Sequence, residues 1–300
     1  MILDDVKEVL PMRPGRLFVT WMLGNTCQYR CSYCNEKYNG GDLPFHPLDR
    51  VLNIMHQLPH CDMMFLGGEP TAWRDFSQML DEAPSHVNVQ IITNGAKGMR
   101  FWEKVVDRLH RVILTAHPEY VDVQKFMELT RLLDTRLIRV NLPMMPDRWD
   151  QCLSMYETFR QAGVKILPKV LLEDFGHTAE KHLSTYTLPQ LAWISSHQEP
   201  DVHTMKLIRF NGDVKGTNPG ELLSSEGGTN FNGWECHTPK DFMGVDADGS
   251  IYDTMCKQRR LIGHINDDTL VRPAQPVTCE QTYCWCYSDL HTRKIRHAQS

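Results

Sequence analysis

The first two-thirds of the chain alternates short apolar runs with amphipathic stretches, and this alternation constrains the fold more than any other feature. Repeated strand–helix units of this kind build a parallel sheet that helices cover. The predicted strands are 18–23, 63–66, 87–93, 111–116, 137–142 and 164–171. Six units are too few to close an eight-stranded barrel, so we predict an open α/β fold with reactive groups at the carboxyl ends of the strands.

Three cysteines lie in one short loop directly after the first predicted strand. Cys27, Cys31 and Cys34 have the spacing C-x3-C-x2-C, and Tyr33 precedes the last of them. Thiolates in this arrangement can hold three corners of a [4Fe–4S] cluster and leave one iron without a protein ligand. An open metal position separates a reactive site from a structural one. A structural zinc loop is the alternative, although zinc loops pair two C-x2-C motifs and no fourth ligand lies in register here.

A second motif closes the next predicted strand and consists of Gly67, Gly68, Glu69 and Pro70. Two glycines after a strand let a ligand approach the backbone, and the neighbouring carboxylate can accept a hydrogen bond from an ammonium group. Together with the cysteine loop, this motif resembles the radical S-adenosylmethionine (radical SAM) superfamily. The resemblance implies a partial (β/α)6 TIM-like barrel, a [4Fe–4S] cluster with an open iron, and SAM bound at its methionine end by this motif.

Polar residues at the ends of the later strands are candidates for the pocket. Thr93 and Asn94 end the third predicted strand, where the family contacts SAM, and a plain strand-to-helix turn is the alternative. His117, Asn141 and Lys169 lie at the ends of the next strands and are the candidate catalytic residues. A lone histidine is more often a hydrogen-bonding partner than a catalyst, so its position at the catalytic edge is what favours His117.

The last quarter of the chain holds five further cysteines: Cys236, Cys256, Cys279, Cys284 and Cys286. The first two flank a predicted hairpin, 242–252, whose Asp-Gly turn brings their sulfurs to one end. The last three form C-x4-C-x-C, so four of the five can complete one site. This pattern resembles the twitch domain, a shortened SPASM extension, and the resemblance implies one auxiliary [4Fe–4S] cluster. A structural zinc site is the alternative, and the spare cysteine among the last three is left open.

These patterns predict four segments along the chain. Residues 1–16 form an N-terminal segment, 17–210 the partial barrel, 211–233 a glycine-rich linker or loop, and 234–300 a small α+β twitch-like domain. We expect no room before the first strand for a peptide-leader-binding module, which would need about eighty residues.

Composition narrows the class of protein further. No run in the 300 residues approaches the length of about 18 apolar residues that a membrane span needs, and the N-terminus lacks the features of a signal peptide. We therefore expect a cytoplasmic protein whose cysteines bind metal more readily than they form disulfides, apart from Cys61 and Cys152, which stand alone as small core residues. The net charge of −5 argues against a protein whose main affinity is for a phosphate backbone.

The resemblance also implies a reaction. A reducing partner of the flavodoxin or ferredoxin type would deliver the electron that cleaves SAM to a 5′-deoxyadenosyl radical, which abstracts hydrogen from a substrate carbon. The layout is similar to compact phage members of the family. This favours rearrangement or oxidation (an isomerase or oxidoreductase reaction) of an amino-acid-like group on a nucleotide, a DNA base or a small molecule. The alternatives are epimerisation or cross-linking of a ribosomal peptide, and a zinc-stabilised binding module without catalysis.

Overall fold

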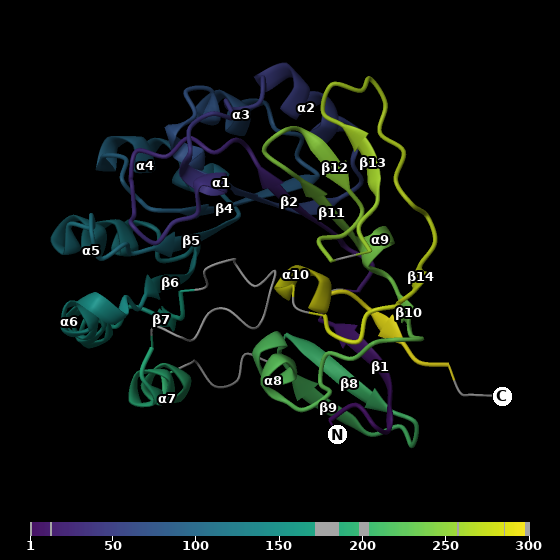
Figure 1. Ribbon diagram of the computed structural model, residues 1–300. Helices are drawn as coiled ribbons and strands as arrows, with labels where there is room; N and C mark the ends of the chain where they lie inside the picture. The colour runs from purple at the N-terminus through teal and green to yellow at the C-terminus, as the bar shows by residue number, and fades with distance from the viewer. Residues whose placement is uncertain are drawn as a thin grey trace. The chain divides into compact units, whose positions relative to one another are not determined.

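The computed structural model describes residues 2–12, 14–171, 186–197, 204–256, 258–284 and 286–297 (Figure 1). The chain forms two compact units. The strand–helix unit comprises Thr20–Leu58 and Met63–Glu199, and the terminal unit comprises Met1–Val19, Pro59–Asp62 and Pro200–Ser300. The two ends of the chain therefore belong to the same unit.

The strand–helix unit is built on strands that follow the chain in order from β2 to β7. They are β2 (Leu17–Met22), β3 (Cys61–Leu66), β4 (Val87–Thr93), β5 (Arg111–Thr115), β6 (Leu137–Pro143) and β7 (Ile166–Lys169), and the first residues of β2 and β3 belong to the terminal unit. The pairs β4–β5, β5–β6 and β6–β7 are parallel. This confirms the predicted α/β fold, and each strand bound lies within two residues of the predicted one.

Helices connect these strands, as the amphipathic stretches predict. They are α1 (Glu36–Asn39), α2 (Leu48–Gln57), η1 (Pro70–Ala72), α3 (Phe76–Glu82), α4 (Met99–Val105), η2 (Val106–Arg108), α5 (Val123–Leu132), η3 (Pro146–Arg148), α6 (Trp149–Gln161) and α7 (Leu188–Ser196). The start of α5 is capped by Asp122, whose carboxylate accepts from the Lys125 N–H at 3.2 Å. Among the helices of the described residues, none combines the length and the apolar character that crossing a bilayer requires.

The core of this unit lies between one face of the sheet and the helices. Leu114 and Val140 are fully buried on that face. A Cβ added to Gly95 would meet Leu114, together with Phe126 and Leu129 of α5, so α5 packs on this face. The pleat points alternate side chains of each strand to the other face, where the register places Ile113 beside Arg139 and Leu167 beside Asn141.

The terminal unit contains a sheet in the order β14-β10-β15-β1-β8-β9. Its strands are β1 (Val6–Pro11), β8 (Met205–Arg209), β9 (Val214–Thr217), β10 (Glu235–Cys236), β14 (Val277–Thr278) and β15 (Lys294–Ile295), and neighbouring strands pair antiparallel. The unit also contains β11 (Phe242–Val245), β12 (Ser250–Tyr252), β13 (Leu261–His264), α8 (Pro219–Ser224), α9 (Thr238–Asp241) and α10 (Tyr287–Leu290). β11 and β12 form the predicted hairpin, and Gly249 has the positive φ of +90° that its turn requires.

Two segments hold secondary structure that the sequence pattern does not indicate. The segment 1–16 holds β1, an interior strand that pairs with β8 and β15. The segment 211–233 was expected to be a linker or loop, yet it holds β9 and α8. Asn218 caps α8 by accepting from the Glu221 N–H at 2.9 Å, and Leu222 and Phe231 are fully buried. Strand β9 pairs with β8, and this pairing satisfies its backbone hydrogen bonds. The glycine content of the segment does not reveal the strand.

Candidate functional site

The cysteine loop (residues 24–34) follows β2 and is held at its base by the Gly-Gly-Glu turn (residues 67–70), which follows β3. The Gly68 N–H donates to the Gly24 carbonyl at 3.0 Å, and the Glu69 N–H donates to the Thr26 carbonyl at 2.8 Å. Backbone bonds of this kind fix the loop in register against the turn. The two motifs that the sequence singles out therefore form one hydrogen-bonded structure.

Neither glycine of the turn has room for a side chain. Gly67 has a φ of +122°, and a Cβ there would lie 2.5 Å from the Gly24 carbonyl oxygen. A Cβ on Gly68 would lie 2.1 Å from the Thr26 carbonyl oxygen. The sequence analysis assigned both glycines to the approach of a ligand. The structure shows a further reason why glycine is needed at both positions, because the backbone of the cysteine loop occupies the space beside them.

Glu69 is buried and joins the ends of β3 and β4. Its Oε1 accepts from the Thr71 N–H at 2.9 Å, from the Thr71 hydroxyl at 2.6 Å and from the Thr93 hydroxyl at 2.7 Å. Its Oε2 accepts from the Asn94 N–H at 2.7 Å. Burial raises the pKa of Glu69, and these four hydrogen bonds oppose the rise. Glu69 thus organises the strand ends that carry Thr93 and Asn94. Sequence reasoning missed Thr71, although it directly follows the motif.

Asn94 links the end of β4 to the cysteine loop. Its side-chain oxygen accepts from Gln28 Nε2 at 3.1 Å, and its side-chain nitrogen donates to Cys27 Sγ at 3.7 Å. Asn94 is buried, so these contacts form away from bulk water. The predicted Asn94 therefore does reach the cysteine loop. Gln28 was missed, although it directly follows the first cysteine.

The three thiols of the loop interact with one another electrostatically. Burial, followed by the charges of Glu119, Cys34 and Cys27, raises the pKa of Cys31 to about 12. Burial also raises the pKa of Cys34 to about 11, with Cys27 adding to the rise. Three crowded thiols stay protonated near neutral pH unless a cationic group stabilises their thiolates. The donor set therefore fits a metal cluster.

His117 follows β5 and contacts the cysteine loop. Its Nδ1 lies 2.5 Å from the Tyr33 hydroxyl and 3.4 Å from Cys31 Sγ. The imidazole stacks on the Tyr33 ring at an interplanar angle of 10° and meets the Tyr29 ring edge-on. Burial lowers the pKa of His117 to about 4. His117 is thus a neutral group packed into the loop, and Tyr29, which the sequence analysis did not single out, is part of the same aromatic cluster.

Asn141 and Lys169 lie on one face at the ends of β6 and β7. The register pairs Asn141 with Thr115 and Lys169 with Pro143, so Arg139, two residues before Asn141, shares this face. Arg139 Nε donates to Asn141 Oδ1 at 3.0 Å. Burial, followed by the charge of Arg139, lowers the pKa of Lys169 to about 8. Arg139 was missed, although the two-residue period of the strand could have revealed it.

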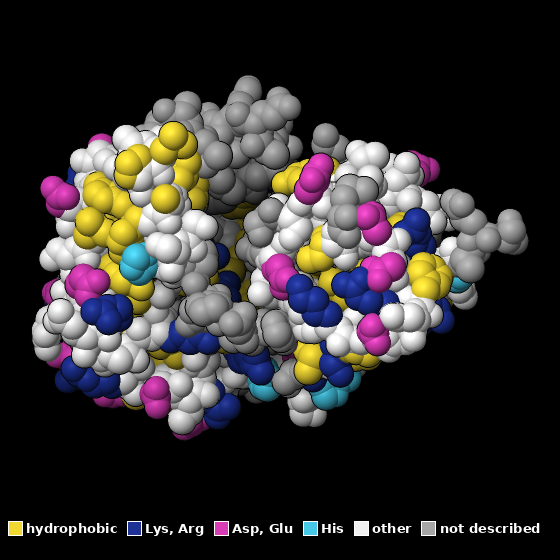
Figure 2. Space-filling model, turned by 90° about the horizontal axis from the view of Figure 1, so that it is seen from below, with side chains coloured by type: hydrophobic (Ala, Val, Ile, Leu, Met, Phe, Trp, Pro, Cys, Tyr) yellow, Lys and Arg dark blue, Asp and Glu magenta, His cyan; other side chains and the backbone are white. Residues whose placement is uncertain are grey.

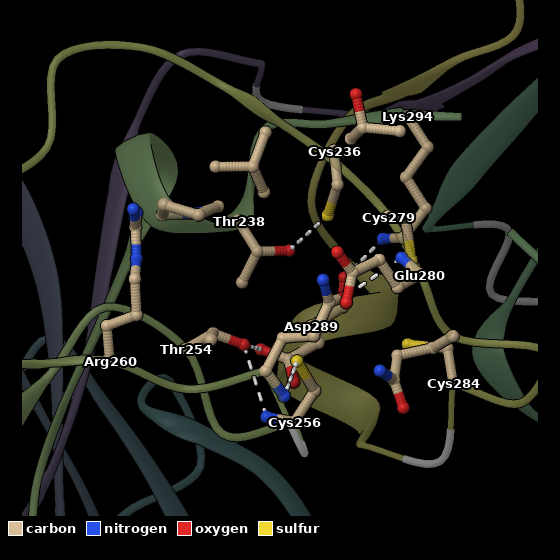
Figure 3. A pocket seen from close by; sticks show the side chains of 15 residues that line it. Cys236, Thr238, Thr254, Cys256, Arg260, Cys279, Glu280, Cys284, Asp289 and Lys294 are labelled. Atoms are coloured by element: carbon tan, nitrogen blue, oxygen red, sulfur yellow. Dashed lines mark hydrogen bonds between the residues drawn. The ribbon is translucent and has the colours of Figure 1, made fainter. Parts of the chain in front are cut away.

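A second group of cysteines lines a cavity of about 220 Å³ in the terminal unit (Figure 3). The lining cysteines are Cys236, Cys256, Cys279 and Cys284. Cys286 is not part of this lining, although it is a described residue. The polar residues of the lining include Thr238, Thr254, Gln258, Arg260, Glu280, Gln281, Asp289 and Lys294. We refer to this feature as the cysteine cavity.

Short strands assemble the cysteine cavity. Cys236 lies on β10, between β14 and β15, where it pairs with Val277 on one side and Lys294 on the other. Cys279 directly follows β14, and its N–H donates to the Trp234 carbonyl at 2.8 Å. Cys236 and Cys279 are therefore brought together by pairing between segments that are distant in the sequence.

Two of the cavity sulfurs have polar neighbours. The Thr238 hydroxyl lies 3.1 Å from Cys236 Sγ, and the Gln258 N–H donates to Cys256 Sγ at 3.3 Å. Hydrogen bonds to ligand sulfurs orient the ligands of a metal centre and tune its potential.

The cysteine cavity has the donor atoms of a thiolate-bound metal centre. Its four cysteine sulfurs border a space of about 220 Å³, and all ten cysteines of the chain are free thiols. Within the described ranges, no three His, Cys, Asp or Glu side chains are arranged to hold a single metal ion. Soft thiolate donors around such a space are suited to an iron–sulfur cluster.

Sequence comparison finds relatives that match one part of the chain. Mycofactocin maturase MftC of Mycobacterium tuberculosis is 31% identical over 110 residues, which are 35% of this chain and 26% of the relative. A probable GTP 3′,8-cyclase of Methanocella arvoryzae is 28% identical over 95 residues, which are 29% of this chain and 31% of the relative. The chain thus spans less than a third of the length of these curated relatives.

Solved structures resemble the fold over most of the chain. Streptococcus suis SuiB bound to precursor peptide SuiA matches with a TM-score of 0.50 and 14% identity, over 84% of this chain and 63% of that chain. The protein anSMEcpe, with bound AdoMet and Cp18Cys peptide, matches with a TM-score of 0.51 and 16% identity, over 84% of this chain and 78% of that chain. At these identities, the likeness is one of fold.

A family model gives the assignment. The model described as the radical SAM superfamily matches residues 21–181. This range is more than half of the 300 residues and includes both the cysteine loop and the Gly-Gly-Glu turn. The chain therefore belongs to the radical SAM superfamily, whose members use a [4Fe–4S] cluster and SAM.

Proposed function

We propose that this protein cleaves SAM reductively and uses the resulting 5′-deoxyadenosyl radical to abstract hydrogen from a carbon of its substrate. One observation carries the proposal, namely that the cysteine loop and the Gly-Gly-Glu turn form a single hydrogen-bonded structure in a radical SAM chain. Cys27, Cys31 and Cys34 would hold a [4Fe–4S] cluster. When bound, this cluster supplies the electron that breaks a carbon–sulfur bond of SAM.

The residues around the loop would bind SAM and position the loop. The turn from Gly67 to Pro70 lies against the base of the loop, and Glu69 holds Thr93 and Asn94 next to it. A molecule bound at the open iron would therefore meet polar groups of both strand ends. His117 and Tyr33 pack together beside Cys31 and would position the loop, because a buried imidazole with a pKa of about 4 is neutral near pH 7 and is then a poor proton donor.

The polar face at the ends of β6 and β7 would contact the substrate. Asn141, Lys169 and Arg139 share this face, and two of them are cationic groups. Cations and an amide at strand ends can orient a polar or anionic substrate group. Their proposed contribution is to hold the reacting carbon in place while the cofactors perform the difficult chemistry.

The cysteine cavity would hold one auxiliary [4Fe–4S] cluster in a twitch-like, SPASM-like domain around residues 234–300. We assign its ligands to Cys236, Cys256, Cys279 and Cys284 because these four line one cavity. Cys286 is then the spare cysteine of the five. The cluster would exchange electrons with the substrate radical or with a reducing partner of the flavodoxin or ferredoxin type.

Two substrate classes are supported by different relatives. SuiB and anSMEcpe, which share the fold and were solved with bound peptides, support a peptide, which would be epimerised or cross-linked. The GTP 3′,8-cyclase supports a nucleotide, on which an amino-acid-like group would be rearranged or oxidised. On the face shown in Figure 2, Lys and Arg side chains are interspersed with Asp and Glu, and the net charge is −5. Interspersed charge counts against duplex DNA as the substrate and leaves single nucleotides, small molecules and peptides.

Anaerobic purification and single-turnover assays test this proposal. We expect a brown protein with about eight irons, as two [4Fe–4S] clusters require, that forms methionine and 5′-deoxyadenosine from SAM under dithionite. Reactions in deuterated water with separate peptide and nucleotide fractions of cell extracts then show which class gains deuterium. A colourless protein with stoichiometric zinc and no 5′-deoxyadenosine would instead indicate a zinc-stabilised binding module.

A further inference from the structure

Lys294 is a buried cation beside the cysteine cavity. Its side chain is 1% exposed, it lines the cavity, and in the strand register it pairs with Cys236 (Figure 3). Its ammonium group donates to the carbonyl of Asp289 and, at 3.2 Å each, to the carbonyl and the hydroxyl of Thr292. It also lies 5.0 Å from the centroid of the Phe231 ring. These hydrogen-bond acceptors are neutral oxygen atoms.

A buried ammonium group is costly unless negative charge lies nearby to offset its removal from water. The four cysteines Cys236, Cys256, Cys279 and Cys284 line the same cavity as Lys294. Thiolates at these positions are therefore well placed to supply that negative charge.

Asp289 is an acidic group beside Lys294. One of its carboxylate oxygens accepts from the Thr254 hydroxyl at 3.0 Å and from the Met255 N–H at 3.3 Å. The other is buried without a hydrogen-bond partner among the described residues. Burial raises the pKa of Asp289, and the charge of Lys294 is the largest influence that opposes the rise, so this carboxylate shares the counter-charge role with the thiolates.

We propose that Lys294 is the fixed counter-charge of the auxiliary site and holds the reduction potential of its cluster at a less negative value. The inference rests on the auxiliary cluster of the proposed function. A cubane bound by four thiolates is negatively charged, and it becomes more so when it accepts an electron. A buried positive charge therefore stabilises the reduced form more than the oxidised form. Lys294 acts through the cluster and not on the substrate, so it is a positioning residue.

Two carboxylate residues lie against the cysteine loop. The Glu69 N–H donates to the Thr26 carbonyl at 2.8 Å, and Glu119 Oε2 accepts from the Ser32 N–H at 2.8 Å. Carboxylates near thiolate ligands disfavour added negative charge, which lowers a cluster potential. The two sites would then be separated in potential, with the loop site as the stronger reductant and the cavity site as the better electron acceptor.

Potentiometric titration of the reconstituted full chain, followed by EPR, tests the inference. Lys294→Met removes the charge, Lys294→Arg keeps it, and Lys240→Met removes an exposed charge on α9 of the same unit as a control. A Cys31→Ala background isolates the signal of the auxiliary cluster. We expect Lys294→Met to shift its midpoint to a more negative potential, whereas Lys294→Arg and Lys240→Met leave it close to that of the unmodified chain.

Each outcome decides a different question. Full iron content with an unshifted midpoint in Lys294→Met overturns the counter-charge role. Lys294→Met could also fail to load the auxiliary cluster. In that case, Lys294→Arg supports the role of charge if it keeps both the iron and the midpoint potential. Loss of the cluster from both variants would show that Lys294 acts by packing alone and would overturn the proposal. About four irons in the unmodified chain would instead remove the auxiliary cluster from the proposed function.

Discussion

The cysteine loop and the cysteine cavity present the same donor atoms by different means. Cys27, Cys31 and Cys34 lie on one loop, and backbone hydrogen bonds to a neighbouring turn fix its base. The cavity cysteines extend from Cys236 to Cys284, and short antiparallel strands bring them together. The loop site is therefore set by local spacing, and the cavity site is set by the topology of the terminal unit. A substitution should act locally in the first and through the sheet in the second.

Replacing a loop cysteine should have the largest effect and should separate the two sites. We expect Cys31→Ala to reduce 5′-deoxyadenosine formation from SAM under dithionite to background, because the cluster loses one of its three protein ligands. Chromatographic quantification of 5′-deoxyadenosine measures this. Cys256→Ala is the matched control, since it removes a cavity cysteine and should leave SAM cleavage in place. Undiminished cleavage by Cys31→Ala would remove the loop from the mechanism.

Cys256, which lines the cavity, and Cys286, which does not, should differ in their effect on iron content. We expect Cys256→Ala to lower the iron content from about eight to about four atoms per chain, because the auxiliary cluster loses a ligand. Cys286→Ala should keep about eight, since Cys286 lies outside the cavity lining. Iron and sulfide analysis of anaerobically reconstituted protein gives both values. Loss of iron in Cys286→Ala with retention in Cys256→Ala would reverse the ligand assignment.

The same contrast explains how much could be predicted from the sequence. The strands β2 to β7 were predicted to within two residues because their patterns are local and strongly apolar. The loop motif and the turn were visible for the same reason. By contrast, β10 and β15 contain two residues each, which is too short for any periodic signal. The ligand choice at the cavity depends on that pairing, so the sequence left it open.

Long-range pairing also explains why the sequence does not indicate the strands of the terminal unit. β1 lies near the N-terminus, yet its partners β8 and β15 lie far along the chain, so no local pattern announces an interior strand. The burial of Lys294 was missed for the same reason. A lysine in a charged stretch near the C-terminus is expected to be solvated, and only its place in the sheet buries it. The contacts of Glu69 were missed because they join the ends of two strands.

A smaller change at the base of the loop should test its anchoring. Gly68→Ala places a Cβ 2.1 Å from the Thr26 carbonyl oxygen, so the backbone must shift. We expect the free energy of unfolding to fall by about 1–3 kcal/mol and SAM cleavage to decline. Gly98→Ala is the control, because a Cβ there meets nothing within 4 Å and its φ is −65°. It should change the free energy of unfolding by less than about 1 kcal/mol. Urea denaturation of both variants measures the difference, and equal effects would show that the close contact is unimportant.

The smallest expected effect concerns Lys169, on the polar face of the sheet. Its pKa is lowered from 10.5 to about 8 by burial and then by the charge of Arg139. Between these values the unfolded chain binds more protons than the folded chain, so the free energy of unfolding rises with pH across that window. Lys169→Met removes this dependence. We therefore expect the unmodified chain to gain stability relative to Lys169→Met between pH 8 and 10.5, by a few tenths to about 1 kcal/mol since solvent screens a half-buried group. Urea midpoints of the apoproteins at several pH values measure the difference, and a constant difference across the window would mean that Lys169 titrates as it does in water.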